Sequence, residues 1–121
     1  MTAREVVEKA KKSGTVEGVA DDMLYTAVER LELMIQKHTG IQFREFDKDV
    51  PLYADGGEVA DGYDKLYDIY VKREACYIRE DWQCYGNYDA MFDIEWTKFK
   101  KEYLRNHKPS GGSFTPDWGW D

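Results

Sequence analysis

Apolar and aromatic positions follow a helical period along two long stretches in the second half of the chain. The first stretch carries a stripe at Tyr63, Leu66, Tyr67, Tyr70, Tyr77 and Tyr85. The second carries a similar stripe at Tyr88, Phe92, Trp96, Phe99 and Tyr103. A broad stripe of this kind is typical of a helix that packs on a core. The pattern therefore predicts two amphipathic helices within residues 63–107.

A break between these helices is expected at Gly86-Asn87. Glycine readily takes the left-handed conformation that ends a helix, and asparagine can cap the free N–H groups of the next one. A connection this short places two helices side by side. We therefore expect a C-terminal antiparallel hairpin whose corner lies at these two residues.

A short helix is expected at the start of the chain. Thr2 and Glu5 have the spacing of a capping box, in which each side chain satisfies a free backbone donor. This pattern predicts a helix over about residues 3–13 that ends at Ser13-Gly14. Its apolar side is thin, so it should dock on another element.

A second helix is expected from Asp21, as N-cap, to about His38, with its end at Thr39-Gly40. Its apolar stripe would cover the hairpin. Tyr25 and Leu33 point away from that stripe. They are either ordinary apolar residues, exposed or covered by a loop, or residues that contact a neighbouring subunit.

Residues 41–62 show no helical period and are longer than an ordinary connection. Short alternating and extended pieces within this loop are also compatible with a small β-hairpin. The predicted fold is all-α: a bundle of about four helices built on the C-terminal hairpin, with a long irregular acidic loop and an extended tail. Residues 1–108 would form one helical domain and residues 109–121 the tail.

The chain is acidic, with a formal net charge of −7 over 121 residues. Residues 41–62 hold six acids against two basic residues, which is more than half of that charge. Proteins that grip the DNA backbone do so with Lys and Arg, so this class is disfavoured. The spacing of Asp47, Asp49 and Asp55 does not fit a calcium-binding loop, so we expect a solvated loop and no metal site.

The sequence contains no recognisable catalytic constellation. Glu74, Asp81 and Glu95 fall on the predicted aromatic stripes, and buried carboxylates can do acid–base chemistry. Pairing with Arg residues or with tyrosine hydroxyls explains them more simply. No nucleophile with an adjacent base and no phosphate-binding glycine pattern accompanies them. We therefore expect neither an enzyme nor a cofactor.

The two cysteines, Cys76 and Cys84, lie eight residues apart on what the pattern predicts to be one helix. Their Cα atoms would then be about 12 Å apart, beyond the ~7 Å limit for a disulfide. This spacing predicts free thiols and a reducing, cytoplasmic compartment. No apolar run approaches ~20 residues and no signal-peptide core is present, so neither a membrane nor secretion is expected.

The last stretch, residues 109–121, combines Pro and Gly with three large aromatic residues: Phe114, Trp118 and Trp120. Such a segment cannot bury much of itself. It either folds back on its own domain or anchors its aromatics in pockets on another chain. We favour the second, because Trp is a frequent hot-spot residue of interfaces.

The string YIREDWQCYGNYDAMFDIEWTKFKKEYLRNHKP, residues 77–109, resembles the C-terminal hairpin of the head-tail connector (adaptor) proteins of long-tailed bacteriophages. The resemblance rests on Asp81, Tyr85, Asn87, the Met91-Phe92 pair, the aromatics Trp96, Phe99 and Tyr103, and the closing Asn106-His107-Lys108-Pro109. It extends over about forty residues.

The resemblance implies a virion protein that assembles as a ring, typically of twelve copies, docked under the portal at the capsid vertex. Such a ring extends the DNA channel, with DNA as passing cargo, and provides the platform for the next connector or the tail. Assembly would take place in the host cytoplasm. Asp47, Asp49, Asp55 and Glu58 are candidates for the channel wall. Phe114, Trp118, Trp120, Tyr25 and Leu33 are candidates for partner contacts. The alternative, which rests on net charge alone, is a small acidic regulator or inhibitor that binds a basic protein surface.

Overall fold

The chain is all-α, as predicted. The computed structural model describes residues 1–106, apart from the side chain of Asn106. It has four helices, α1 (Ala3–Ser13), α2 (Asp21–Thr39), α3 (Asp64–Ile78) and α4 (Trp82–Asn106). Residues 1–106 contain isolated β-bridges but no strand. The predicted tail, with Phe114, Trp118 and Trp120, lies outside the described residues.

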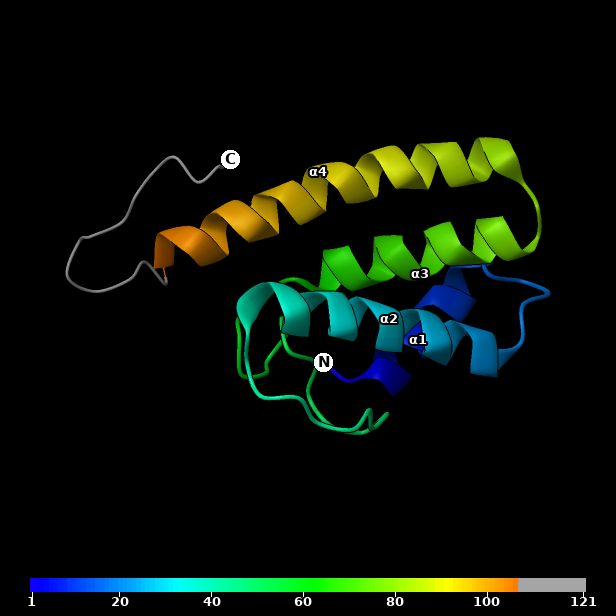
Figure 1. Ribbon diagram of the computed structural model, residues 1–121. Helices are drawn as coiled ribbons and strands as arrows, with labels where there is room; N and C mark the ends of the chain where they lie inside the picture. The colour runs from blue at the N-terminus through cyan, green and yellow to red at the C-terminus, as the bar shows by residue number, and fades with distance from the viewer. Residues whose placement is uncertain (107–121) are drawn as a thin grey trace.

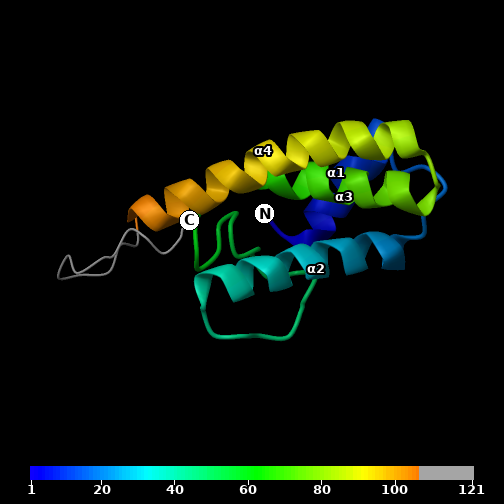
Figure 2. The ribbon, with the colours of Figure 1, turned by 45° about the horizontal axis from the view of Figure 1, so that its top comes forward.

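Helix α3 is the centre of the bundle, because it contacts each of the other three helices. Figure 1 shows α4 running along one side of α3, with α1 and α2 on the other side. Figure 2 shows the long segment between α2 and α3 beside the C-terminal half of α2. The core lies between these layers, and its largest fully buried side chains include Tyr67, Phe99, Leu24, Leu31 and Ile35.

The ends of the first two helices follow local sequence signals. The predicted capping box of α1 is present, with Thr2 and Glu5 each accepting from the other's backbone N–H. Gly40 takes a left-handed conformation at the end of α2, with φ of 73°. The start of α2 differs from the prediction. Asp21 is the first helical residue and Ala20 the N-cap, so the Asp21 carboxylate is left for an ion pair with Lys11 at 3.1 Å.

The corner between α3 and α4 lies at residues 79–81, so the predicted corner at Gly86-Asn87 is wrong. Glu80 takes the left-handed conformation there, with φ of 59°. The Asp81 side chain accepts from the Cys84 N–H at 3.1 Å and so caps the first turn of α4. Because Asp81 is itself a good capping residue, α4 starts before the glycine and runs through it.

Because the corner lies at residues 79–81 and not at 86–87, the two cysteines fall on different helices and lie close together. Cys76 ends up near the end of α3 and Cys84 in the first turn of α4, with the corner between them. Their Cα atoms are 5.6 Å apart and their sulfurs form a disulfide. The predicted free thiols, held on one helix at a separation of about 12 Å, are therefore wrong. The error follows directly from the misplaced corner.

Candidate functional site

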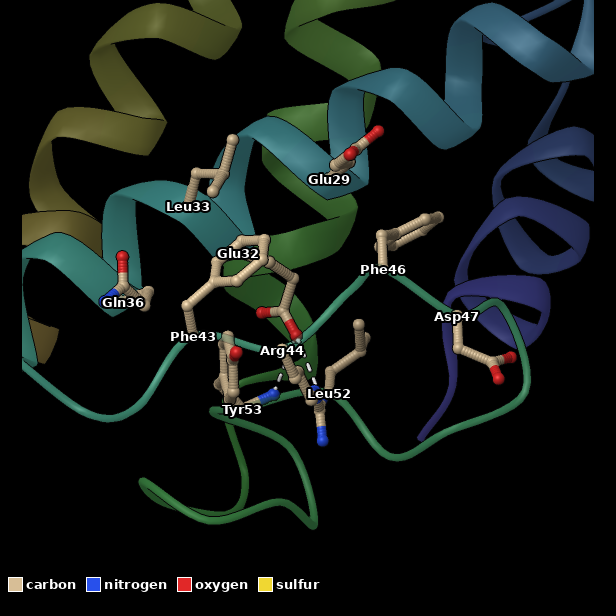
Figure 3. Close-up of a pocket in the computed structure, with 10 residues that line it drawn as sticks. All are labelled: Glu29, Glu32, Leu33, Gln36, Phe43, Arg44, Phe46, Asp47, Leu52 and Tyr53. Carbon is tan, nitrogen blue, oxygen red and sulfur yellow. Dashed lines mark hydrogen bonds and ion pairs between the residues drawn. The ribbon is translucent and has the colours of Figure 1, made fainter.

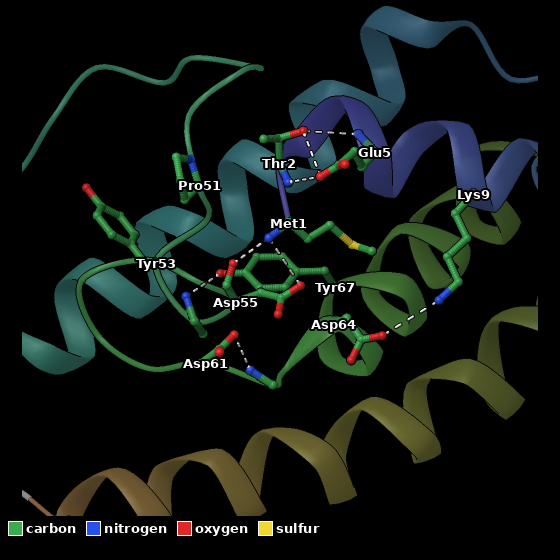
Figure 4. A network of polar contacts seen from close by, with 12 residues as sticks. Met1, Thr2, Glu5, Lys9, Pro51, Tyr53, Asp55, Asp61, Asp64 and Tyr67 are labelled. Atoms are coloured by element: carbon green, nitrogen blue, oxygen red, sulfur yellow. Dashed lines mark hydrogen bonds and ion pairs between the residues drawn. The ribbon is translucent and has the colours of Figure 1, made fainter.

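The candidate site is the acidic loop, residues 41–62, together with the surfaces of α2 and the N-terminus that hold it. Figure 3 shows the first half of this loop lying across α2, with Glu32 beneath it. Figure 4 shows its second half beside Met1 and the start of α3. The loop has little regular structure, so side-chain contacts must fix its position.

Glu32 is the central anchor of the loop. It lies on the inner face of α2 and is buried. Its carboxylate accepts from the Tyr67 hydroxyl at 2.5 Å and from the Tyr53 backbone N–H at 2.9 Å. The Tyr67 hydroxyl also accepts from the Ala54 N–H at 3.0 Å. Two consecutive loop N–H groups are thus satisfied by side chains of α2 and α3, which fixes the loop backbone against both helices.

Arg44 closes this network from the solvent side. Its guanidinium lies 3.6 Å from the Glu32 carboxylate and 3.8 Å from that of Glu58. It also donates to the Pro51 carbonyl at 2.6 Å and lies over the Tyr53 ring at 4.3 Å. One cation therefore joins both halves of the loop to α2.

Burial changes the proton affinity of the two groups at the centre. Burial raises the pKa of Glu32 above its ordinary value, although the hydrogen bonds from Tyr67 and Tyr53 oppose the shift. Burial also raises the pKa of Tyr67, and the adjacent Glu32 carboxylate adds to the shift. Tyr67 therefore keeps its proton at neutral pH and remains a hydrogen-bond donor to Glu32.

The N-terminal residues hold the middle and the second half of the loop. The Met1 amino group donates to the Asp55 carbonyl at 2.7 Å, and the Leu52 N–H donates to the Met1 carbonyl at 2.9 Å. The Arg4 guanidinium pairs with the Asp49 carboxylate at 2.7 Å. This pair lowers the pKa of Asp49. The first residues of the chain therefore hold the loop at several points.

The four acids expected on a channel wall fall into two groups. Asp47, Asp49 and Glu58 are exposed on the loop surface. Asp55 is buried and faces the Met1 amino group, with its Oδ2 atom 3.8 Å away. Burial raises the pKa of Asp55. The loop thus presents three of the four carboxylates to the outside, and the fourth faces inward.

The two helix residues predicted to face away from the stripe both lie next to the loop. Tyr25 is half-buried, and the Lys48 ammonium lies over its ring at 4.3 Å. Leu33 is half-buried and lines the hollow of Figure 3 together with Phe43. The tail aromatics Phe114, Trp118 and Trp120 lie outside the described residues, so the structure does not bring them to this site.

The hollow beneath the loop is too small for a substrate. The space open to the centre of a water molecule is about 20 Å³, which is room for one water. Small-molecule sites are typically several hundred Å³. Within residues 1–106, no cluster of His, Cys, Asp and Glu side chains has the arrangement of a metal site. In the same range, every helix is too short or too polar to cross a bilayer.

The loop anchor was missed in the sequence, although a signal for it was present. Glu32 follows Val28 by four residues and precedes Ile35 by three, so helical spacing places it on the buried face. An acid on such a face needs a partner. The three acids expected on the aromatic stripes each have a basic partner. Glu74 lies 2.9 Å from Arg73, and Asp81, which is exposed at the corner, lies 3.9 Å from Arg79. Glu95 lies 3.7 Å from Lys65.

Comparison with known proteins gives no relative. No protein-family model matches the chain, and neither curated proteins nor solved structures show a significant similarity to it.

Proposed function

We propose that this chain is a structural virion protein, a head-tail connector (adaptor) of a long-tailed bacteriophage. It forms a ring, of twelve copies as the resemblance implies, that docks on the portal and extends the DNA channel. The ring then provides the platform for the next connector or the tail. The observation that carries the proposal is the string over residues 77–109, which spans the corner and all of α4. The small all-α bundle supports it.

The acidic loop gives this proposal a physical role. Asp47, Asp49 and Glu58 are exposed on a segment that is fixed by the Glu32 network and by the N-terminus. A wall of fixed negative charge repels phosphate, so DNA passes without sticking. In the ring, these acids line the channel.

The tail supplies the contact with partners. Phe114, Trp118 and Trp120 dock on the portal or on an adjacent copy, and the segment gains contact area as it orders. The chain has no catalytic role in this proposal: it acts by assembly in the host cytoplasm and remains in the neck of the virion.

Electron microscopy of the purified chain, with and without portal, tests the proposal. Rings on portal-containing particles are the expected result. A chain truncated after Pro109, or carrying Trp118→Ala and Trp120→Ala, should fold but no longer join these particles. Ser113→Ala in the same segment is the matched control. Failure of the full chain to join portal particles would refute the proposal. A compact monomer that instead binds a basic protein surface would favour the acidic regulator.

The channel role has its own test. Asp47→Lys with Glu58→Lys should turn a ring that ignores duplex DNA into one that binds it, with an affinity that falls steeply with salt. Glu8→Lys with Glu17→Lys changes the same charge at exposed positions outside residues 41–62. Equal DNA binding by both double variants would show that the loop does not line the channel wall.

A further inference from the structure

Exposed apolar side chains gather at the end of the molecule that holds the α3–α4 corner. We call this the corner patch: Met23, Tyr77, Ile78 and Trp82. Trp82 is 58% exposed and Tyr77 54%. Their rings lie 5.5 Å apart in an edge-to-face contact. Trp and Tyr at this exposure, joined into one surface, are typical of a protein interface.

The corner patch borders a hollow between α2 and α3 of about 390 Å³, lined by Met23, Tyr77 and Ile78. Its rim is acidic. Asp22 lines the hollow and makes no ion pair within the described part of the chain. Glu80 and Asp81 are exposed beside the corner. The two nearby cations, Arg30 and Arg79, are paired with Glu74 at 3.6 Å and with Asp81 at 3.9 Å.

A second exposed surface lies along α4. We call it the outer stripe: Ile94, Lys98, Lys101 and Arg105. Ile94 is 67% exposed, the highest value among the large apolar side chains of residues 1–106. The four residues line a shallow groove of about 460 Å³ together with Asp93, Thr97 and Glu102, so the groove holds three basic and two acidic side chains. None of the three basic residues makes an ion pair in residues 1–106. In Figure 1, α3 lies along one side of α4 and no helix lies along the opposite side.

We infer that the outer stripe of one copy docks on the corner patch of the next. Ile94 is the apolar anchor for the hollow, and the three cations meet the acidic rim. The groove on α4 has one more basic than acidic lining residue, and the hollow has one more acidic than basic lining residue. Unlike surfaces are therefore favoured over like ones. The favoured contact is therefore head-to-tail, between unlike surfaces of identical chains. Such a contact generates a ring when the rotation closes. This inference rests on the proposed function, for which it names the contact between neighbouring copies.

Sedimentation of the full chain tests the contact. The unmodified chain should form species larger than its 14.2 kDa monomer as its concentration approaches about 1 mM, the weak end of specific affinity. Trp82→Ala, or Lys98→Glu with Lys101→Glu, should weaken this association at least about tenfold. All these positions are exposed, and circular dichroism checks that each variant folds. Phe43→Ala, which removes an equally exposed aromatic, and Lys12→Glu with Lys37→Glu are the matched controls.

Mixing the two kinds of variant is the decisive measurement. A Trp82→Ala chain keeps its outer stripe, and a Lys98→Glu/Lys101→Glu chain keeps its corner patch. Their mixture should form a dimer through the one intact pair of surfaces and stop there. A contact between like surfaces predicts no such rescue. A monomeric unmodified chain at about 1 mM, association unaffected by the variants, or a mixture that stays monomeric would each overturn the inference.

Portal-containing particles separate this inference from the proposed function. If both kinds of variant join particles as fully as the unmodified chain, the contact is wrong and the connector function stands. If the unmodified chain self-associates through these surfaces but never joins particles, the connector function is wrong and the contact stands.

Discussion

The two sides of α3 are held by different kinds of contact. Toward α4 aromatic rings pack on one another: Tyr70 lies 5.0 Å from Phe92, and Tyr63, at the start of α3, lies 5.1 Å from Phe99. Toward the acidic loop they are directional hydrogen bonds, with Tyr67 and Glu32 joined at 2.5 Å. Ring packing stabilises roughly in proportion to the area it buries. A buried polar network depends on every partner being present.

This difference predicts how each side responds to damage. Loss of one ring on the α4 side should lower the stability of the whole bundle, because the rings form one continuous layer. Loss of one polar partner on the loop side should loosen the loop first. The five predictions that follow test this contrast, and they are ordered by the size of the expected effect.

The largest loss is expected for Phe99→Ala. Phe99 is fully buried and packs on Tyr63, Trp96 and Tyr103. Removing the ring leaves a cavity in the layer, at a cost of about 3–5 kcal/mol in the free energy of unfolding. Urea denaturation measures it. Leu104→Ala, at an exposed site on the same helix, should cost less than about 0.5 kcal/mol. Similar losses for both variants would contradict the aromatic layer.

The α4 side was the more predictable one, because its contacts follow a local period. The spacing of Phe92, Trp96 and Phe99 along the chain is enough to place them on one face of a helix. Local signals also gave the ends of α1, through Thr2 and Gly14. The corner was misplaced because two signals compete within a few residues. Asp81 caps α4, and the helix tolerates Gly86 in its interior.

The loop side was much less predictable, because its contacts join residues far apart in sequence. Glu32 and Tyr53 are 21 residues apart, and Tyr67 reaches Glu32 across 35. No local pattern encodes such a pairing. An excess of acids indicated an exposed loop, which holds for Asp47, Asp49 and Glu58. It gave no sign that Asp55 faces inward to meet Met1.

The second largest effect is expected from reduction of the Cys76–Cys84 disulfide. Opening this short loop should cost about 2–3 kcal/mol by chain entropy. Unfolding with and without reductant measures the loss, and thiol titration reports the bond itself. A Cys84→Ser chain is the control and should not respond to reductant. Free thiols in air-oxidised protein would refute the bond.

Tyr67→Phe tests the polar side. The substitution keeps the ring but removes a donor to Glu32 and an acceptor for the Ala54 N–H. Leaving buried polar groups without partners should cost about 1–3 kcal/mol. Amide exchange should speed up at residues 53–54 more than in α4. Tyr25→Phe, at a half-buried position beside the same loop, is the control. Uniform acceleration across all four helices would mean that the loop is not a separate unit.

The contribution of Glu32 to stability can be separated by comparing the pH dependence of the unmodified chain with that of a Glu32→Gln variant. Burial raises its folded pKa above the ordinary value of 4.5. In the window above 4.5 and below the folded pKa, the folded state keeps a proton that the unfolded state has lost. Stability therefore falls as pH rises through this window. Glu32→Gln removes this component, so the variant minus wild-type difference should grow from pH 4.5 upward. A difference that stays flat with pH would show that burial does not raise the pKa.

The smallest effect, and the only gain, is expected for Gly86→Ala. Gly86 lies inside α4, and a Cβ built on it meets no atom within 4 Å. Alanine should therefore stabilise the helix by about 0.5–1 kcal/mol, because glycine loses more backbone entropy on folding. If the corner instead lay at Gly86-Asn87 with a left-handed glycine, alanine would destabilise the chain. Gly40→Ala, at a left-handed helix end with φ of 73°, is the control that should lose stability. The sign of this one substitution, read from thermal unfolding, thus decides where the hairpin turns. It also decides whether Cys76 and Cys84 can meet at all.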